Sequence, residues 1–292
     1  MKIEKVGVVG AGLMGSGIAE VAAKAGFDVV VREIDDASAD RGRGRIEASM
    51  DRAVEKEKLS AEERDAALER IAFTTKVEAI ADRDLVIEAI VENLDAKNEL
   101  FGALDELCSD RAIFASNTSS LTITDMAAAT DRPDRVIGLH FFNPVPVMRL
   151  VEVVRTIATS DETFEAVVDF ARAVGREPIA AKDNSGFVVN LLLVPYMLDA
   201  VRQLERGVAS IEDIDTGMVL GCGHPMGPFT LADFVGNDTI LRIAEIMFDE
   251  YREQRYAPPP LLRRMVSMGR HGRKAGRGFY DYSGDEPVPI PV

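Results

Sequence analysis

The fold is decided by the stretch Val6-Gly-Val-Val-Gly10-Ala-Gly12-Leu-Met-Gly15, in which a short β-branched run ends in the pattern G-x-G-x-x-G. A helical pattern follows at 18–25, and Gly26 closes it. Glycines in such a turn let a pyrophosphate approach backbone N–H groups, and the start of the helix adds partial positive charge. The pattern predicts a dinucleotide-binding turn made by Gly10, Gly12, Leu13, Met14 and Gly15. A glycine turn that serves only packing is the alternative.

An acidic residue stands at the end of the second predicted strand. Glu33 follows Gly15 by 18 residues, which places it to accept hydrogen bonds from the hydroxyls of an adenosine ribose. A carboxylate there repels a 2′-phosphate, so we expect NAD(H) rather than NADP(H). The neighbouring Arg32 keeps NADP(H) open as an alternative.

The first part of the chain alternates between short β-branched runs and helical patterns, which is typical of a parallel sheet with helices on both faces. A charged segment with helical spacing, Asp35–Arg70, is too long for a simple crossover and predicts a helical hairpin that projects from the sheet. We expect an α/β, Rossmann-like, doubly wound domain over residues 1–184. Its expected strands are 6–9, 28–31, 85–89, 113–115 and 136–139.

The pattern changes after Asp183, where strand alternation stops and long helical patterns begin. They cover 186–206, 230–255 and 261–269. We therefore expect a second, all-α domain over residues 185–292. Its apolar helix faces exceed what one small layer needs, which predicts a homodimer.

Charge and cysteine content exclude several classes of protein. The chain of 292 residues has 34 basic and 49 acidic side chains, a formal charge of −15. This argues against a broad surface for nucleic acid or for an anionic membrane. The isolated Cys108 and Cys222 lack metal-ligand spacing and favour a reducing, cytoplasmic setting without a metal site. The apolar run 187–198 is too short to span a bilayer, so we expect a soluble protein.

An alcohol dehydrogenase that uses nicotinamide needs a group to accept the hydroxyl proton, and histidine suits this role near neutral pH. The chain has three histidines. His140 follows the predicted strand 136–139, and ligands bind at the carboxyl ends of parallel strands. His224 lies in a proline-rich turn and His271 in a basic segment, so His140 is the candidate.

Glu152 is the candidate partner of His140. It interrupts the apolar run 150–154, where a carboxylate is costly unless it is paired. If the chain reverses around Pro146, an antiparallel register places residue 140 opposite residue 152. The carboxylate would then orient the imidazole and fix its tautomer. From spacing alone, a core histidine and a solvent-facing acid on an edge strand are equally good interpretations.

The segment His140-Phe-Phe-Asn-Pro-Val-Pro-Val-Met148, with Glu152 after it, resembles the signature of the 3-hydroxyacyl-CoA dehydrogenase family. The resemblance extends over essentially the whole chain. Several long motifs in the right order are more specific than any one of them. Besides the glycine turn they are 91–97, 116–120, 183–190, 223–229 and 274–280.

The resemblance implies a role for individual side chains. It implies His140 as general base and Glu152 as its partner. It also implies oxygen contacts from Asn190 and Ser119, cofactor contacts from Glu92, Lys97, Ser119, Asn143 and Lys274, and coenzyme A contacts from Ser49, Lys56 and Ser119. Six basic residues of the hairpin could meet the phosphates of coenzyme A; without the resemblance they would be interpreted as a solvated charged face. They are Arg41, Arg43, Arg45, Arg52, Lys56 and Lys58.

Two positions depart from the family pattern. The family more often has aspartate where Glu33 stands, and Ala275 replaces a common threonine beside Lys274. The first makes cofactor preference less certain, and the second puts one hydrogen bond in doubt.

The implied activity is the reversible oxidation of (S)-3-hydroxyacyl-CoA, with short chains such as 3-hydroxybutyryl-CoA and acetoacetyl-CoA as expected substrates. One alternative is an enzyme of the same activity that prefers NADP(H). Others are a dehydrogenase of a free hydroxy or sugar acid, and a non-catalytic NAD(H)-binding or structural protein.

Overall fold

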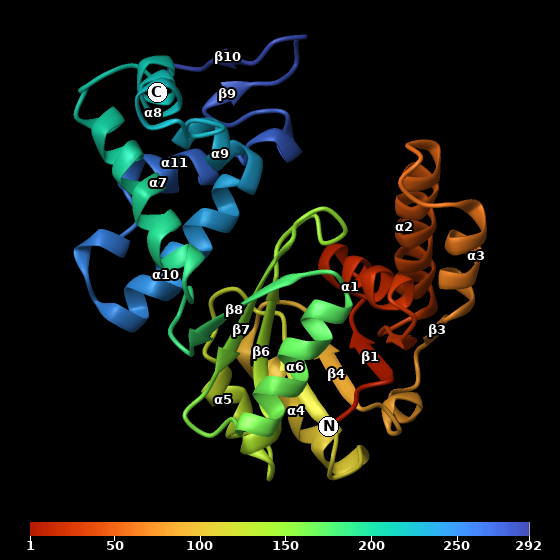
Figure 1. Cartoon of the computed structure of the whole chain (residues 1–292). Coiled ribbons are helices and arrows are strands. Elements are labelled where there is room, and N and C mark those ends of the chain that lie inside the picture. Colours follow the sequence, from red (N-terminus) through yellow and green to blue (C-terminus); the bar gives the residue numbers. More distant parts are fainter. Residues whose placement is uncertain (292) are drawn as a thin grey trace. The chain divides into compact units, whose positions relative to one another are not determined.

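A computed structural model describes residues 1–291, and the chain divides into two compact units, Met1–Phe187 and Val188–Val292. The first unit is built around one sheet and the second around a group of helices (Figure 1).

The first unit is a three-layer α/β structure whose sheet has the order β3-β2-β1-β4-β5-β6-β7-β8. Its strands are β1 (Lys5–Val9), β2 (Asp28–Arg32), β3 (Ile71–Thr74), β4 (Leu85–Glu88), β5 (Ile113–Ser116), β6 (Val136–Phe141), β7 (Leu150–Arg155) and β8 (Glu177–Lys182). Its helices are α1 (Leu13–Lys24), α2 (Asp36–Glu55), α3 (Ala61–Glu69), α4 (Leu94–Leu107), α5 (Ile123–Ala127) and α6 (Asp161–Ala173), with short 3₁₀ turns at Val77–Ile80 and Pro133–Arg135.

The direction of the strands determines where the functional edge of the sheet lies. Strands β1 to β6 are all parallel, β7 runs antiparallel to β6, and β8 is parallel to β7. The strand order reverses between β1 and β4, because the chain first builds outward through β2 and β3 and then returns to the other side of β1. Ligands of open α/β sheets bind at such a switch point, beyond the carboxyl ends of the strands.

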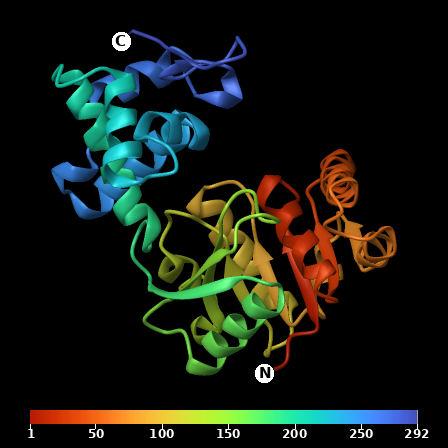
Figure 2. The same ribbon diagram turned by 45° about the horizontal axis from the view of Figure 1, so that its top comes forward.

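Side-chain alternation along the strands separates two hydrophobic cores. Val8 belongs to the core formed with α1 and α6, whereas Val9 belongs to the core formed with α4 and α5. Because both faces of the central strands are covered, they read as continuous apolar runs rather than as alternating ones. The expectation of a doubly wound sheet is confirmed (Figure 2).

The charged segment after β2 forms the predicted helical hairpin. Asp35 caps α2 by accepting a hydrogen bond from the backbone N–H of Ser38. Ser60 and Glu63 form a reciprocal capping box at the start of α3. Ile46 and Met50 of α2 are buried against the rest of the first core. The hairpin is therefore packed along one side and charged along the other.

The second unit is a helical domain, as predicted. Its helices are α7 (Val189–Glu205), α8 (Ile211–Cys222), α9 (Pro228–Val235), α10 (Asn237–Tyr251) and α11 (Pro260–Ser267), with 3₁₀ turns at Gln254–Tyr256 and Arg273–Ala275. Strands β9 (Tyr280–Asp281) and β10 (Val288–Pro289) add a small antiparallel pair. Among the described residues, no helix has both the length and the apolarity to cross a membrane.

Several boundaries differ from those expected. The single helix predicted over 230–255 is two helices, because Gly236 has a φ of +105° and turns the chain between α9 and α10. Strand β6 continues to Phe141, so His140 lies inside the strand rather than after it. Edge strands β3 and β8 were not expected from the sequence, since edge strands need no continuous apolar run.

Candidate active site

Two glycines of the turn after β1 leave no room for a side chain. Gly10 has a φ of +97°, and a Cβ atom on it would lie 2.6 Å from the carbonyl oxygen of Ala89. A Cβ atom on Gly15 would lie 1.8 Å from the carbonyl oxygen of Gly10. In contrast, a Cβ atom on Gly12 would meet no atom within 4 Å. Gly10 and Gly15 therefore need to be glycine for packing, whereas Gly12 opens onto free space that a ligand can occupy.

The start of α1 provides hydrogen-bond donors beside that space. Gly12 is the N-cap of α1, and, within the part of the chain that the structure describes, no side chain caps this helix and its first turn contains no acid. The first N–H groups of a helix have no partner within it and attract anions. The glycine turn therefore fits the phosphates of a dinucleotide, and Leu13 and Met14 are the first two residues of α1 beside it.

Glu33 lies directly beyond β2, beside the glycine turn. Its carboxylate accepts hydrogen bonds from the backbone N–H of Ala11 at 2.5 Å and of Ile34 at 2.9 Å. The side chain is half-buried. The carboxylate is thus fixed next to the expected phosphate position, where it could accept hydrogen bonds from a ribose and would repel a 2′-phosphate.

His140 and Glu152 form a buried pair across two strands. They are register partners in the antiparallel ladder of β6 and β7, and His140 Nδ1 lies 2.6 Å from Glu152 Oε2. His140 is 6% exposed and Glu152 is fully buried. A buried carboxylate at that distance favours the tautomer with the proton on Nδ1, which leaves Nε2 to accept a proton from a substrate. The structure therefore brings together the two residues whose pairing the sequence left open.

Aromatic rings and one amide hold His140 in place. The rings of Phe142 and Phe187 lie 4.6 Å and 5.6 Å from the imidazole, centroid to centroid. Asn117, at the end of β5, accepts a hydrogen bond from the backbone N–H of Phe141 at 2.9 Å. Sequence reasoning did not single out Asn117, although it lies in the motif 116–120. Its amide continues the hydrogen bonding between β5 and β6 beyond the regular ladder.

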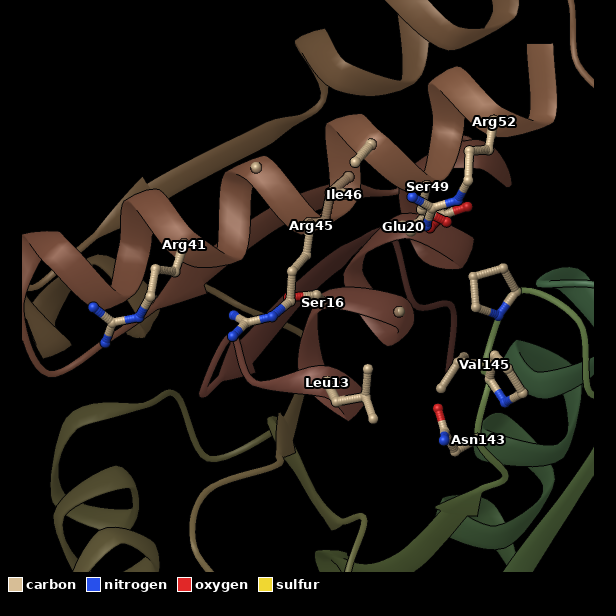
Figure 3. A pocket seen from close by; sticks show the side chains of 15 residues that line it. Leu13, Ser16, Glu20, Arg41, Arg45, Ile46, Ser49, Arg52, Asn143 and Val145 are labelled. Atoms are coloured by element: carbon tan, nitrogen blue, oxygen red, sulfur yellow. The ribbon is translucent and has the colours of Figure 1, made fainter. Parts of the chain in front are cut away.

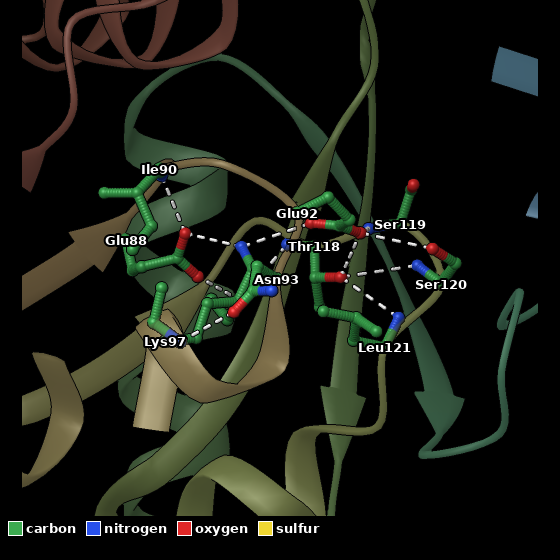
Figure 4. A network of polar contacts seen from close by, with 11 residues as sticks. Glu88, Ile90, Glu92, Asn93, Lys97, Thr118, Ser119, Ser120 and Leu121 are labelled. Carbon is green, nitrogen blue, oxygen red and sulfur yellow. Dashed lines mark hydrogen bonds and ion pairs between the residues drawn. The ribbon is translucent and has the colours of Figure 1, made fainter. Parts of the chain in front are cut away.

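A buried ion cluster lies at the ends of β4 and β5, between the glycine turn and His140 in the order of the sheet (Figure 4). Lys97 Nζ is 2.6 Å from Glu88 Oε1 and 3.2 Å from Glu92 Oε2. The side chains of Lys97, Glu88 and Glu92 are 1%, 0% and 11% exposed. Such charges are tolerated in a protein interior only when they are paired and hydrogen-bonded.

Glu92 links this cluster to the loop after β5. One of its carboxylate oxygens accepts hydrogen bonds from Thr118 Oγ1 at 2.5 Å and from the backbone N–H of Ser119 at 3.3 Å. Burial raises the pKa of Glu92, but the charge of Lys97 and these hydrogen bonds outweigh burial and hold the pKa below its ordinary value. The loop that carries Ser119 is therefore tied to an ionised carboxylate.

Glu88 was not predicted from the sequence as a site residue. It is the last residue of β4, and its carboxylate also accepts hydrogen bonds from Ser116 Oγ at 2.5 Å and from the backbone N–H of Ile90 at 2.7 Å. The available signal was the one that identified Glu152, namely an acid within an apolar strand.

A pocket of about 470 Å³ lies between α1, α2 and the turn after β6 (Figure 3). Ser49 and Asn143 line it, and so do three arginines of α2. Those arginines are Arg41, Arg45 and Arg52. Lys56, the C-cap of α2, is exposed and does not line the pocket. The pocket therefore combines basic side chains with one edge of the glycine turn, a combination suited to a phosphate-bearing ligand.

Asn190 and Lys274 belong to the second unit. Asn190 lies in the first turn of α7, and Lys274 Nζ lies 2.6 Å from Asp238 Oδ1. Their expected roles toward substrate and cofactor stay predictions.

Comparison with known proteins identifies the family. The family model for the 3-hydroxyacyl-CoA dehydrogenase NAD binding domain matches residues 5–184, and the model for the C-terminal domain of the same family matches residues 186–282. The chain belongs to the 3-hydroxyacyl-CoA dehydrogenase family. The resemblance inferred from the sequence motifs is thereby confirmed, and the first unit contains the NAD-binding domain of this family.

Relatives match this chain along nearly its whole length. A 3-hydroxybutyryl-CoA dehydrogenase of Mycobacterium tuberculosis is 53% identical over 282 residues, covering 96% of this chain and 99% of the relative. The mitochondrial hydroxyacyl-coenzyme A dehydrogenase of Homo sapiens is 50% identical over 288 residues, covering 96% and 91%. The crystal structure of (S)-3-hydroxybutyryl-CoA dehydrogenase from Ralstonia eutropha has a TM-score of 0.93 and 46% identity, covering 97% of this chain and 100% of that one.

Proposed function

We propose that this protein catalyses the reversible, NAD-dependent oxidation of (S)-3-hydroxyacyl-CoA to 3-oxoacyl-CoA, with 3-hydroxybutyryl-CoA and acetoacetyl-CoA as its short-chain substrate pair. The observation that carries the proposal is the buried contact of 2.6 Å between His140 Nδ1 and Glu152 Oε2. It lies in the sheet whose glycine turn fits a dinucleotide. The activity named for the relatives needs such a base beside such a cofactor.

In the oxidation, Nε2 of His140 accepts the proton of the C3 hydroxyl group while the C3–H bond breaks and the C3=O bond forms. NAD+, which the glycine turn and Glu33 would hold, would supply the acceptor for the hydride that leaves C3. Glu152 accepts the hydrogen bond from Nδ1–H and stabilises the positive charge that the imidazole acquires. The buried setting of the pair keeps this attraction strong, because little water screens it.

Residues of the first unit take most of the cofactor roles that we propose. We assign the phosphates to the backbone of the glycine turn and the adenosine ribose to Glu33. The fixed carboxylate of Glu33 supports a preference for NAD(H) over NADP(H). Ser119 is assigned to the substrate oxygen, together with Asn190 of the second unit. The further cofactor contacts that we propose come from Glu92, Lys97, Ser119, Asn143 and Lys274.

The pocket beside α2 supports a role in holding coenzyme A. Ser49 lines this pocket, and its neighbours Arg45 and Arg52 supply positive charge that the formal charge of −15 does not reveal. We assign the phosphates of coenzyme A to this side of the hairpin, with Lys56 at the far end of α2. Replacing Arg52 by Gln should raise the KM for acetoacetyl-CoA by about ten-fold without changing the affinity for NADH, since one charged hydrogen bond is worth roughly 1.5–3 kcal/mol.

We also propose a homodimer formed through the second unit, in the cytoplasm. Leu192 of α7 and Leu220 of α8 are 69% and 80% exposed, which supports an apolar contact with a second copy. Two free cysteines support a reducing compartment. Light scattering on the purified protein, with Leu220→Glu as the disrupting variant, tests the oligomer.

The decisive assay of the function is the reduction of acetoacetyl-CoA with NADH and with NADPH in parallel. Faster turnover with NADH supports the proposal, whereas faster turnover with NADPH overturns the cofactor assignment. Acetoacetate without coenzyme A is the control substrate, and turnover as fast as with acetoacetyl-CoA would point to a dehydrogenase of free acids.

A single variant tests the role of the base. His140→Gln should abolish turnover and leave the dissociation constant of NADH within a few fold, because the imidazole contacts the substrate rather than the phosphates. Substantial residual turnover would remove His140 from the mechanism.

A further inference from the structure

The order of the strands defines a path across the sheet. The glycine turn follows β1, His140 lies in β6, and β4 and β5 lie between them. Neighbouring strands are about 4.8 Å apart, so the turn and His140 are separated by roughly 14 Å across the sheet. A dinucleotide bound by its phosphates at the turn, with its nicotinamide near His140, must pass the ends of β4 and β5. Its nicotinamide half therefore lies near the loops that follow these strands.

The Glu88–Lys97–Glu92 cluster lies at this place on the path (Figure 4). Two carboxylates share one ammonium group, so the cluster has a net charge of −1 when all three groups are ionised. Glu88 and Lys97 are almost completely buried, and water therefore screens this charge weakly. The lowered pKa of Glu92, which the charge of Lys97 and its hydrogen bonds maintain against burial, keeps that carboxylate ionised at neutral pH.

We propose that the net negative charge of the Glu88–Lys97–Glu92 cluster makes the protein bind NAD+ more favourably, relative to NADH, than a neutral cluster would. The proposal rests on the proposed function only in taking NAD as the cofactor. The nicotinamide ring is positively charged in NAD+ and neutral in NADH, whereas the rest of the dinucleotide is the same. A fixed charge near the ring therefore acts on the difference between the two affinities.

The hydrogen bonds of Glu88 do not explain why the cluster has a second carboxylate besides Glu92. The contacts that Glu88 makes with Ser116 Oγ and with the backbone N–H of Ile90 need an acceptor, which a glutamine would also provide. Lys97 would keep Glu92 as its ion partner. Burying an additional charge is costly, so its presence calls for an electrostatic role.

Three variants change the charge of the cluster in known steps. Glu88→Gln gives a net charge of 0, Lys97→Gln gives −2, and the double variant Glu88→Gln/Lys97→Gln returns it to −1. The quantity to measure is the ratio of the dissociation constant of NADH to that of NAD+, by titration calorimetry without substrate. A unit charge about 10 Å from the ring, at an effective dielectric constant near 20, corresponds to roughly a ten-fold change in that ratio.

We expect the ratio of the dissociation constant of NADH to that of NAD+ to fall about ten-fold in Glu88→Gln and to rise in Lys97→Gln. In the double variant it should be close to the wild-type value. Two controls separate charge from shape. Ser116→Ala removes a hydrogen bond to Glu88 without changing the charge, and it should leave the ratio unchanged. ADP-ribose lacks the nicotinamide ring, and its affinity should be similar in all variants.

Equal changes in both affinities, or a double variant that behaves like Glu88→Gln, would overturn the proposal and leave the cluster a purely structural role. If Glu88→Gln does not fold, Glu92→Gln gives the same net charge at the more accessible carboxylate and should lower the ratio in the same way. The measurement needs no turnover. A wild-type protein that fails to reduce acetoacetyl-CoA would overturn the proposed function, but it would leave this binding test intact.

Discussion

Replacing Glu152 by Gln removes one charge from the centre of the site with little change in shape. The carboxylate is fully buried and lies 2.6 Å from His140 Nδ1. A glutamine could still accept the hydrogen bond through its oxygen, but it would not stabilise the imidazolium that forms during oxidation. If its amide group donated to Nδ1 instead, the proton would move to Nε2 and the base would be lost.

The geometry gives the size of the effect. With about 4 Å between the two charge centres and an effective dielectric constant near 20, the lost attraction is about 4 kcal/mol. At about 1.4 kcal/mol for each factor of ten, kcat should fall by up to roughly a thousand-fold. This agrees with the range of about 10² to 10⁴ typical of general base catalysis. Affinity for NADH should change little, since the carboxylate lies away from the phosphate turn.

The assay is steady-state reduction of acetoacetyl-CoA, with thermal unfolding as a check on the fold. His140→Gln gives the lower limit of the rate, and the double variant of His140 and Glu152 should be no slower than His140→Gln alone, because the two residues act as one unit. A well-folded Glu152→Gln protein with a kcat within ten-fold of wild type would refute the reasoning.

Three further outcomes are expected from the described residues. In α2, Gly42→Ala should lower the melting temperature and weaken NADH binding, because its Cβ atom would lie 2.3 Å from the Cβ atom of Ala11 in the glycine turn. The control Gly44→Ala should raise the melting temperature slightly, because a Cβ atom on Gly44 would meet no atom within 4 Å. Burial raises the pKa of Asp233 despite the backbone hydrogen bonds that it accepts, so the folded state takes up a proton at higher pH than the unfolded chain. The free energy of unfolding of wild type relative to Asp233→Asn should therefore grow as the pH falls from 7 toward the ordinary carboxyl pKa of about 4, measured by urea unfolding, and a difference independent of pH would contradict this. Burial raises the pKa of the Cys108 thiol to about 11, so a thiol reagent should modify the exposed Cys222 rapidly and Cys108 only after unfolding; two rapidly reacting thiols would contradict this.

Local patterns predicted the parts of the site that depend on local geometry. Gly15 needs glycine because of a contact with Gly10 only a few residues away, and the pairing of residues 140 and 152 follows from the position of one reversal near Pro146. Glu152 was identifiable because an acid within an apolar strand needs a partner.

The remainder depended on how separate elements meet in the fold. The ion pair of Glu88 with Lys97 joins a strand end to a helix, and the hydrogen bond from Phe141 to Asn117 joins two strands. Spacing along the chain predicts neither pairing. The break at Gly236 was missed for a different reason, because a glycine within a helical pattern does not disclose its φ angle.

The position of His140 and Glu152 within a strand ladder has a consequence for the way the enzyme loses activity. Both residues lie in β6 and β7, which are interior strands of an eight-stranded sheet because β8 covers the outer side of β7. Separating them requires breaking interior ladder hydrogen bonds, which open only in large cooperative fluctuations. The α2–α3 hairpin, which is more solvent-exposed, is able to fray on its own. Heating should therefore impair the binding of coenzyme A before it disrupts the proton-transfer pair, and amide exchange would record the hairpin as fast and the ladder as slow.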